Sequence, residues 1–402
     1  MPERWRQLAA LSLAELLALS LWFSASAVLP ALQREWSLGA GGSAGLTIAV
    51  QLGFIAGTLA SALGNLPDIW SPRYLMTGSA LLGAAANGAL ALWVDSLAGA
   101  LALRFVTGVA MAGAYPPAMK IMATWFREGR GLAIGILVGA LTVGSATPWL
   151  IRGITTWRWR HILLAASGLA VLAAVVVVLL VREGPNRFPS ARFDPRMALA
   201  VFRERGPRLA CLGYFGHMWE LYAMWAWIGL FLFESARVAG AIGYAGLAPS
   251  TATFVVIATG ALGCWLGGVA SDRWGRTAAT MWAMALSGAC AATIGLTFGG
   301  PPGLTLALAV VWGITVIADS AQFSTAITEL SPAAYVGTAL TMQTCVGFAL
   351  TNVSIWLLLP VVNVVGWRWA FATLAIGPAL GVVAMARLRA APEAVKMAGG
   401  RR

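Results

Sequence analysis

The chain contains a series of long apolar segments, each close to the length that a helix needs to cross a lipid bilayer. The hydrocarbon core of a bilayer is about 30 Å thick, and a helix of roughly 20 apolar residues spans it. Polar or Gly- and Pro-containing breaks separate about twelve such segments. The expected spans are 7–29, 43–65, 73–94, 98–120, 130–152, 160–182, 208–233, 247–271, 277–298, 303–327, 334–359 and 365–388. We therefore predict an all-α, polytopic membrane protein.

The charge content excludes an ordinary water-soluble fold. Only 10% of the residues are charged and 59% are hydrophobic, with a mean hydropathy of +0.79. A soluble domain carries roughly 25% charged residues, because water must wet its surface. The alternation of apolar and polar residues that marks a membrane β-barrel is not visible. With a soluble fold and a membrane β-barrel excluded, the composition predicts helices that span a lipid bilayer.

The net charge of +12 comes almost entirely from arginines at the edges of the apolar segments. This distribution is typical of topology signals and phospholipid contact, and it argues against a nucleic-acid partner. If the N-terminus lies in the cytoplasm, the arginines that fall outside are Arg34, Arg152, Arg158, Arg160, Arg237 and Arg368. Most other basic residues then lie inside, so we expect both termini to be cytoplasmic.

Cysteines and histidines give no sign of a metal site. Cys211, Cys264, Cys290 and Cys345 fall in or beside apolar segments without ligand spacing, and the chain has only two histidines. We interpret the cysteines as small core residues and expect no metal or cofactor. The first apolar segment has no signal-type cleavage site and is expected to be a retained helix.

An internal repeat divides the chain. Three motifs recur at offsets of 204 to 210 residues: Glu15 to Trp22 as Glu220 to Trp227, Gly64/Asp68/Trp70 as Gly268/Asp272/Trp274, and Trp157–Trp159 as Trp367–Trp369. Such parallel repeats are typical of transporters whose two halves surround a central pathway. We predict a six-helix bundle over 1–182, a proline-rich cytoplasmic linker over 183–207, and a second six-helix bundle with a short cytoplasmic tail over 208–402.

The two repeated loops resemble the loop signature of the major facilitator superfamily, G-x-L-a-D-r-x-G-r-[RK]. The resemblance to this superfamily extends over the whole chain. Gly64, Leu66, Asp68 and Arg73 fit the first copy, and Gly268, Asp272, Arg273, Gly275 and Arg276 fit the second. The resemblance implies that Asp68, Arg73, Asp272, Arg273 and Arg276 help to hold a cytoplasmic gate closed, through carboxylate contacts with helix ends and guanidinium groups. The alternative is a pair of charged cytoplasmic turns.

Other segments are similar to bacterial permeases of the nitrate or cyanate type. These segments are Arg104–Gly108, Gly113–Lys120, the glycine-rich fifth span, Ala318–Ser324 and Gly337–Leu340. The G-P-x-x-G-G element of many drug/proton antiporters is absent from the fifth span, which favours a permease over drug efflux. The resemblance implies a location in the bacterial inner membrane.

Ionisable groups within the spans are candidates for function, because an unpaired charge in a bilayer costs several kcal/mol. Arg104 either binds an anionic substrate in the cavity or bonds neighbouring carbonyl groups. Further candidate substrate-binding residues are Trp22, Tyr115, Trp227, Gln343 and Asn352.

Proton coupling is expected at the buried acidic groups. Glu15 and Glu220 lie at matching positions of the first and seventh spans, and His217 shares a helix face with Glu220. Asp319 could pair with Arg104 or Lys120, or bind a cation. Buried carboxyl and imidazole groups can exchange protons near neutral pH, although polar contacts that fix helix packing would use the same residue types.

Together these features predict a secondary transporter, not an enzyme, that works by alternating access. The chain has no G-x-x-x-x-G-K-[ST] loop for ATP, so a proton or substrate gradient would drive it. The first hypothesis is proton-coupled symport of a small organic or inorganic anion by a monomer, with membrane lipid as its surroundings. Proton-coupled efflux of drugs or metabolites is the second hypothesis, and a membrane sensor that does not transport is a third.

Overall fold

The computed structural model describes residues 2–64, 66, 70–126, 130–186, 200–332 and 336–402. The regular elements in these ranges are helical. Those of the N-half are α1 (Glu3–Leu19), α2 (Ser24–Ala27), α3 (Leu29–Glu35), α4 (Ala40–Leu63), α6 (Pro72–Trp93), α7 (Leu97–Met111), α8 (Tyr115–Trp125), α9 (Arg130–Ile154) and α10 (Trp159–Leu180).

The C-half is also built from helices, of which α13 and α19 are the longest. Its elements are α12 (Ala200–Arg203), α13 (Arg205–Val238), α14 (Pro249–Ala258), α15 (Gly260–Trp274), α16 (Arg276–Thr293), η1 (Ile294–Thr297), α17 (Pro302–Thr315), α18 (Ser320–Leu330), α19 (Val336–Val365), α20 (Trp367–Ala370), η3 (Phe371–Ala375), α21 (Ile376–Arg389), η4 (Pro392–Lys396) and η5 (Ala398–Gly400).

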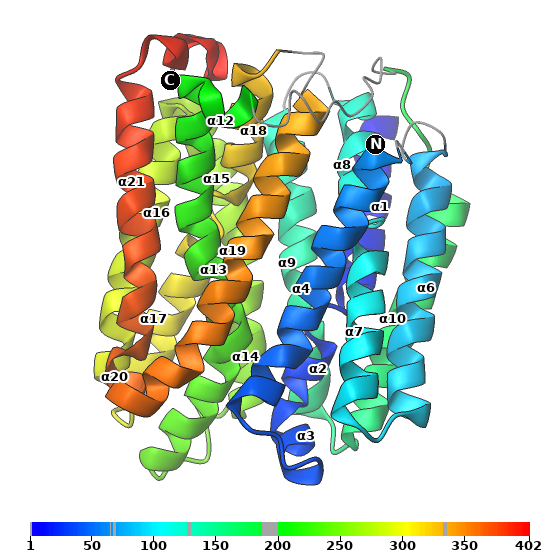
Figure 1. Ribbon diagram of the computed structural model, residues 1–402, viewed down its shortest axis with the longest axis vertical. Helices are drawn as coiled ribbons and strands as arrows, with labels where there is room; N and C mark the ends of the chain where they lie inside the picture. Colours follow the sequence, from blue (N-terminus) through cyan, green and yellow to red (C-terminus); the bar gives the residue numbers. More distant parts are fainter. Residues whose placement is uncertain (1, 65, 67–69, 127–129, 187–199, 333–335) are drawn as a thin grey trace.

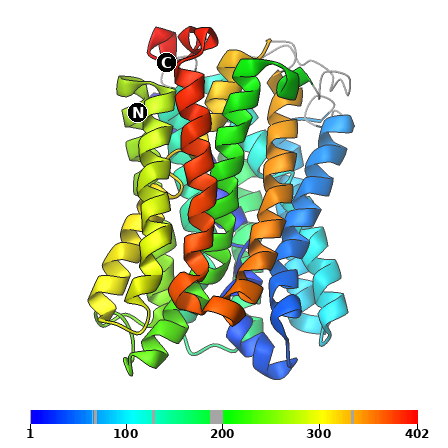
Figure 2. The same ribbon diagram turned by 60° about the vertical axis from the view of Figure 1, so that its left-hand side comes forward.

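The two halves lie side by side with their helices roughly parallel (Figure 1). The main helix contacts between them are those of α4 with α19 and of α9 with α14, α15 and α18. Figure 2 shows α19 beside α4 from a second direction. Both chain ends lie on one face of the molecule, which we call the terminal face, and the opposite face is the distal face.

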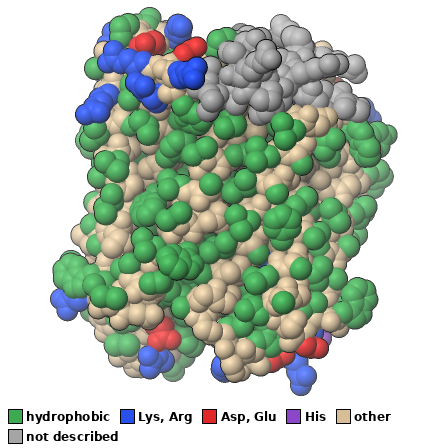
Figure 3. Space-filling model, in the orientation of Figure 1, with side chains coloured by type: hydrophobic (Ala, Val, Ile, Leu, Met, Phe, Trp, Pro, Cys, Tyr) green, Lys and Arg blue, Asp and Glu red, His purple; other side chains and the backbone are tan. Residues whose placement is uncertain are grey.

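Ten of the described helical segments are long and apolar enough to cross a membrane. The other two expected spans correspond to α1–α3, which is interrupted, and to the 34-residue helix α13. Charged side chains gather at the two ends of the molecule, and an apolar band lies between them (Figure 3). This surface confirms the prediction of an all-helical, polytopic membrane protein.

Several spans are broken near their middle instead of running as continuous helices. The first is interrupted between Leu19 and Ser24, the fourth between Met111 and Tyr115, and the tenth between Thr315 and Ser320. Such interruptions release backbone carbonyl and amide groups from the helical ladder, and these groups need partners inside a membrane. The breaks therefore mark places where polar side chains gather.

Close glycine contacts repeat in the two halves. A Cβ atom at Gly108 would lie 1.9 Å from the Val50 carbonyl oxygen, and one at Gly313 would lie 1.8 Å from that of Val256. These pairs are offset by 205 and 206 residues. Only glycine permits this approach of α4 to α7 and of α14 to α17, so the sequence repeat reappears as a repeat in packing.

Replacing Gly108 with alanine is expected to lower the thermal stability sharply, because the new methyl group would overlap the Val50 carbonyl and force the two helices apart. Overpacking of this kind costs about 1–3 kcal/mol or more. Gly78→Ala is the matched control: Gly78 lies within α6 with no atom near its missing Cβ, so alanine there should be neutral or stabilising. Unfolding temperatures in detergent compare the two. Equal values would contradict the close contact.

Candidate functional site

Six aromatic side chains meet where the two halves touch, and we call them the central aromatic cluster. The N-half supplies Trp22, Phe23 and Phe54, and the C-half supplies Tyr222, Trp225 and Phe348. The ring centroids of Phe54 and Phe348 are 4.5 Å apart, and those of Tyr222 and Phe348 are 4.9 Å apart. All six side chains are buried. The cluster therefore fills the space between the halves.

Amide side chains lie among the same helices with part of their hydrogen-bonding capacity unused. The Thr351 hydroxyl donates to Gln51 Oε1 across the contact between the halves. Gln51 Nε2, both polar atoms of Gln343 and Asn352 Oδ1 are buried and have no hydrogen-bond partner among the described residues. Unused polar atoms of this kind are suited to a ligand or to water.

Two of the predicted aromatic ligands differ in their surroundings. Trp22 lies in the central aromatic cluster, and its buried indole Nε1 has no partner among the described residues. The indole of Trp227 instead donates to the Ile355 carbonyl at 3.0 Å and holds α13 against α19. Trp22 therefore keeps a free donor, whereas Trp227 is engaged in helix packing.

Glu15 is fully buried in α1, and neither carboxylate oxygen has a hydrogen-bond partner among the described residues. It interacts electrostatically with Tyr115, the first residue of α8 after the break in the fourth span. Tyr115 in turn lies within electrostatic range of Tyr214 and Tyr222 of α13. Glu15 thus lies near the contact between the halves without a fixed partner.

The sequence places His217 on the same helix face as Glu220, but in the structure His217 pairs with Asp319 instead. His217 Nδ1 lies 2.9 Å from Asp319 Oδ1, and both side chains are 1% exposed. Asp319 lies in the break of the tenth span, directly before α18, and is 204 residues from Tyr115, which follows the corresponding break of the fourth span. Sequence spacing finds residues on one helix face, but not a partner from another span.

Glu220 has a complete set of partners. One carboxylate oxygen accepts from the Ser287 hydroxyl at 2.8 Å and the other accepts from the Trp312 indole at 2.7 Å. Asp319 lies within electrostatic range of this carboxylate. Glu15 and Glu220 therefore differ: the repeat places them at equivalent positions, but only Glu220 is held by donors.

Arg104 binds groups of its own half. Its guanidinium donates to the carbonyl oxygens of Leu21, Trp22 and Leu46, and to Ser24 Oγ and Asn87 Oδ1. The Leu21 and Trp22 carbonyls are those released by the break after α1. All three guanidinium nitrogens are thus engaged, and the side chain is 0% exposed. This geometry favours the structural alternative over anion binding.

The sequence of this chain matches a family model over most of its length. The model of the major facilitator superfamily matches residues 11–355. The chain belongs to this superfamily. It is therefore a transporter and not an enzyme.

The chain is similar to two known proteins. The probable high-affinity nitrate transporter 2.4 of Oryza sativa subsp. japonica is 27% identical over 169 residues, which cover 38% of this chain and 34% of the rice protein. The chain thus matches about a third of the length of that relative. The crystal structure of the human organic anion transporter MFSD10 (TETRAN) has a TM-score of 0.70 and 16% identity, covering 96% of this chain and 100% of the other. That likeness shows the fold.

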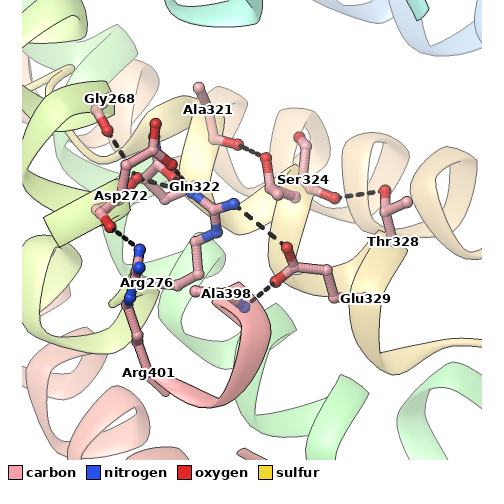
Figure 4. A network of polar contacts seen from close by, with 12 residues as sticks. Gly268, Asp272, Arg276, Ala321, Gln322, Ser324, Thr328, Glu329, Ala398 and Arg401 are labelled. Atoms are coloured by element: carbon pink, nitrogen blue, oxygen red, sulfur yellow. Dashed lines mark hydrogen bonds and ion pairs between the residues drawn. The ribbon is translucent and has the colours of Figure 1, made fainter. Parts of the chain in front are cut away.

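A polar network lies on the terminal face of this superfamily member (Figure 4). The Arg276 guanidinium donates to Ser271 Oγ, Asp272 Oδ1, Gln322 Oε1 and Glu329 Oε1 at distances of 2.7 to 3.3 Å. The chain end joins it, since the amide of Ala398 donates to Glu329 and Arg401 donates to the Asp272 carbonyl. The network ties α15, α16 and α18 together.

Asp272 also faces the other half. A Cβ atom at Gly131, the second residue of α9, would lie 3.4 Å from Asp272 Oδ1 and 3.5 Å from Arg276 Nη1. A carboxylate at a helix N-terminus is stabilised by the helix dipole. Arg273, by contrast, is exposed and has no ion pair within the described ranges. The second loop therefore contacts the N-half through Asp272 and Arg276.

The first loop is described only in part. Asp68 lies outside the described residues, as do 187–199 of the expected linker. Arg73 donates to the carbonyls of Val177 and Val178 near the end of α10, where a guanidinium complements the helix dipole.

Sequence reasoning missed several residues of the central region. Asn87 accepts from Ser24 and Arg104 and donates to Leu163 and Ser167, which makes it the hub of the N-half network. It and Gln51 are amides within apolar spans, and that rarity is a usable signal. Phe54 and Phe348 carry no such signal, because aromatic residues in a span as often face lipid.

Proposed function

We propose that this protein is a proton-coupled transporter that moves a small anion across the bacterial inner membrane by alternating access. The observation that carries the proposal is the set of buried ionisable groups within the membrane spans. Glu15 lacks any partner among the described residues, and His217 and Asp319 pair at a break of the tenth span. Such groups are costly in a membrane and typically mark ion or proton pathways.

Support for an anion comes from the relatives and from charge. The rice relative is described as a nitrate transporter and the human structure as an organic anion transporter. Among the described residues, the helix ends and loops at the distal face carry three carboxylates, Glu35, Asp95 and Glu234, and six arginines, Arg34, Arg152, Arg158, Arg160, Arg237 and Arg368. A positive surface attracts anions to the mouth of a pathway.

In this proposal Glu15 is the first candidate proton carrier and the His217–Asp319 pair is the second. The unused polar atoms of Trp22, Gln343 and Asn352, together with Tyr115, are candidates to bind the substrate. Arg104 and Trp227 support the helices that hold these groups. Glu220, whose oxygens already accept two hydrogen bonds, is a weaker candidate for proton transfer.

Alternating access requires contacts between the halves that break and reform. We propose that Asp272 and Arg276 close the terminal face against α9, with Arg73 stabilising the corresponding region of the N-half. The proposed bundles are 1–182 and 208–402, joined by 183–207. The terminal face is taken as cytoplasmic, because arginines outside the distal set concentrate there.

The test is solute uptake into proteoliposomes with an imposed pH gradient, using nitrate, cyanate and small carboxylates. Uptake of an anion that follows the inward proton gradient is the expected result. If no anion moves, but cationic or lipophilic compounds move in response to pH, the anion assignment is wrong and the protein belongs with proton-coupled exporters.

Asp272→Asn is expected to slow transport and to favour opening at the terminal face, because it weakens the charge at the N-terminus of α9. A carboxylate at a helix N-terminus contributes about 1 kcal/mol, which corresponds to a shift of about fivefold between two states. Labelling of a cysteine introduced in the cavity from the terminal side measures the shift. Arg273→Gln is the control, since Arg273 is exposed and unpaired among the described residues. Equal labelling in both variants would argue against the gate.

A further inference from the structure

A pocket opens between the two halves near the distal face, away from the buried groups described above. Its volume is about 100 Å³. The N-half contributes the end of α2, the start of α3 and the last turns of α9, whereas α13 and the start of α14 close it from the C-half. The pocket is therefore formed only when both halves are present.

Arg152 supplies the positive charge of this pocket and has no carboxylate partner among the described residues. The three carboxylates of the distal face are already paired: Glu35 and Asp95 with Arg160, and Glu234 with Arg237. The remaining charged neighbour is Arg34, which interacts with Arg152 electrostatically. Arg34 lies outside the pocket lining, so Arg152 is the cation of the pocket, and an anion is the group that would stabilise its guanidinium.

Trp149 adds a second unused donor. It lies three residues before Arg152, so both side chains are on one face of α9. The Trp149 side chain is 5% exposed, and its indole Nε1 is buried with no partner within the described ranges. Its ring is fitted against Gly229 of α13, where a Cβ atom would lie 2.4 Å from Cη2. The tryptophan is thus fixed by the opposite half with its N–H unsatisfied.

The remaining lining is mainly apolar. Leu29, Leu230 and Phe233 line the pocket, with the hydroxyl of Ser250 at the start of α14. A bare inorganic ion would gain nothing from the apolar walls, whereas an anion with a hydrocarbon body would bury that body against them. The volume limits the body to a small group, on the scale of one aromatic ring.

We propose that this pocket is an outer binding site for a small organic monoanion, such as a carboxylate with an apolar body, held by Arg152 and the indole N–H of Trp149. The proposal rests on the proposed anion transport and names its substrate class: an organic anion in preference to nitrate. The site would take the anion at the distal face before it reaches the centre.

The site is tested by measuring the binding of benzoate to the full-length protein in detergent with titration calorimetry. Benzoate should bind to the wild type, and Arg152→Gln should weaken it about tenfold or more, the loss expected for a charge-assisted hydrogen bond. Trp149→Phe keeps the ring, removes the N–H and should weaken binding less. Arg152→Lys keeps the charge and should retain part of the affinity.

Arg368→Gln is the matched control. It removes one exposed arginine of the same face that lies outside the pocket and has no ion pair among the described residues, and benzoate affinity should not change. Benzyl alcohol, with the same body and no charge, and nitrate, with charge and no body, should both bind more weakly than benzoate. The proposal is wrong if Arg152→Gln binds benzoate as the wild type does, or if nitrate binds as tightly as benzoate.

Uptake assays separate this site from the proposed function. If the wild type takes up anions and Arg152→Gln does so with unchanged KM, the outer-site proposal is wrong, whereas the proposal of anion transport is supported. If benzoate binding depends on Arg152 but no anion is transported under any gradient, the transport proposal is wrong, whereas the outer-site proposal is supported. A raised KM with unchanged maximal rate in Arg152→Gln supports both.

Discussion

Glu15→Gln is expected to abolish uptake driven by a pH gradient while leaving exchange of labelled for unlabelled substrate intact. Glutamine has nearly the same volume as glutamate and cannot carry the proton. Exchange at equal pH on both sides requires only that the loaded protein reorient, so it does not need net proton movement. Parallel measurements of gradient-driven uptake and of counterflow in proteoliposomes distinguish the two activities.

Glu220→Gln provides the matched comparison for Glu15, because the two residues occupy equivalent positions of the repeat. Both oxygens of Glu220 accept hydrogen bonds, from Ser287 and Trp312. The substitution should therefore lower thermal stability more than Glu15→Gln does, and affect pH-driven uptake less. Glu204→Gln, at an exposed carboxylate before α13, controls for loss of charge. Retained pH-driven uptake in Glu15→Gln would remove Glu15 from the mechanism.

Arg104→Ala is expected to lower the stability of the protein directly, and to lower its affinity for the substrate only as a consequence of that loss. Removal of the guanidinium leaves the carbonyls of Leu21, Trp22 and Leu46 without this donor in a buried site. Each buried acceptor left without a partner costs about 1–3 kcal/mol. The predicted result is a large fall in unfolding temperature, measured by size-exclusion chromatography of heated samples in detergent.

Arg104→Lys discriminates between the two roles considered for this residue. A lysine keeps the positive charge but cannot reproduce the planar fork that reaches several carbonyls at once, so it should rescue little of the stability. If Arg104 instead bound the anion, lysine would preserve much of the uptake, and the defect of Arg104→Ala would be a raised KM in a stable protein. That outcome would overturn the structural assignment.

The residues near positions 15 and 220 illustrate how far a sequence repeat can be followed. The repeat places Glu15 and Glu220 at matching positions of their spans, and it reappears in the glycine contacts of Gly108 and Gly313. It could not distinguish a carboxylate without donors from one with two, since the donors Ser287 and Trp312 come from other spans. Nor could helix periodicity find Asp319 as the partner of His217.

The sequence by itself determined that the chain is helical, spans a membrane many times and consists of two related halves. These properties follow from segment length, hydropathy and repetition, which are local or periodic along the chain. Only the tertiary structure decided which ionisable groups are paired, that Arg104 serves the broken first span, and that Arg152 and Trp149 line one pocket. Those properties depend on side chains from different helices meeting across the halves, and in a membrane any of several spans could have supplied the partner.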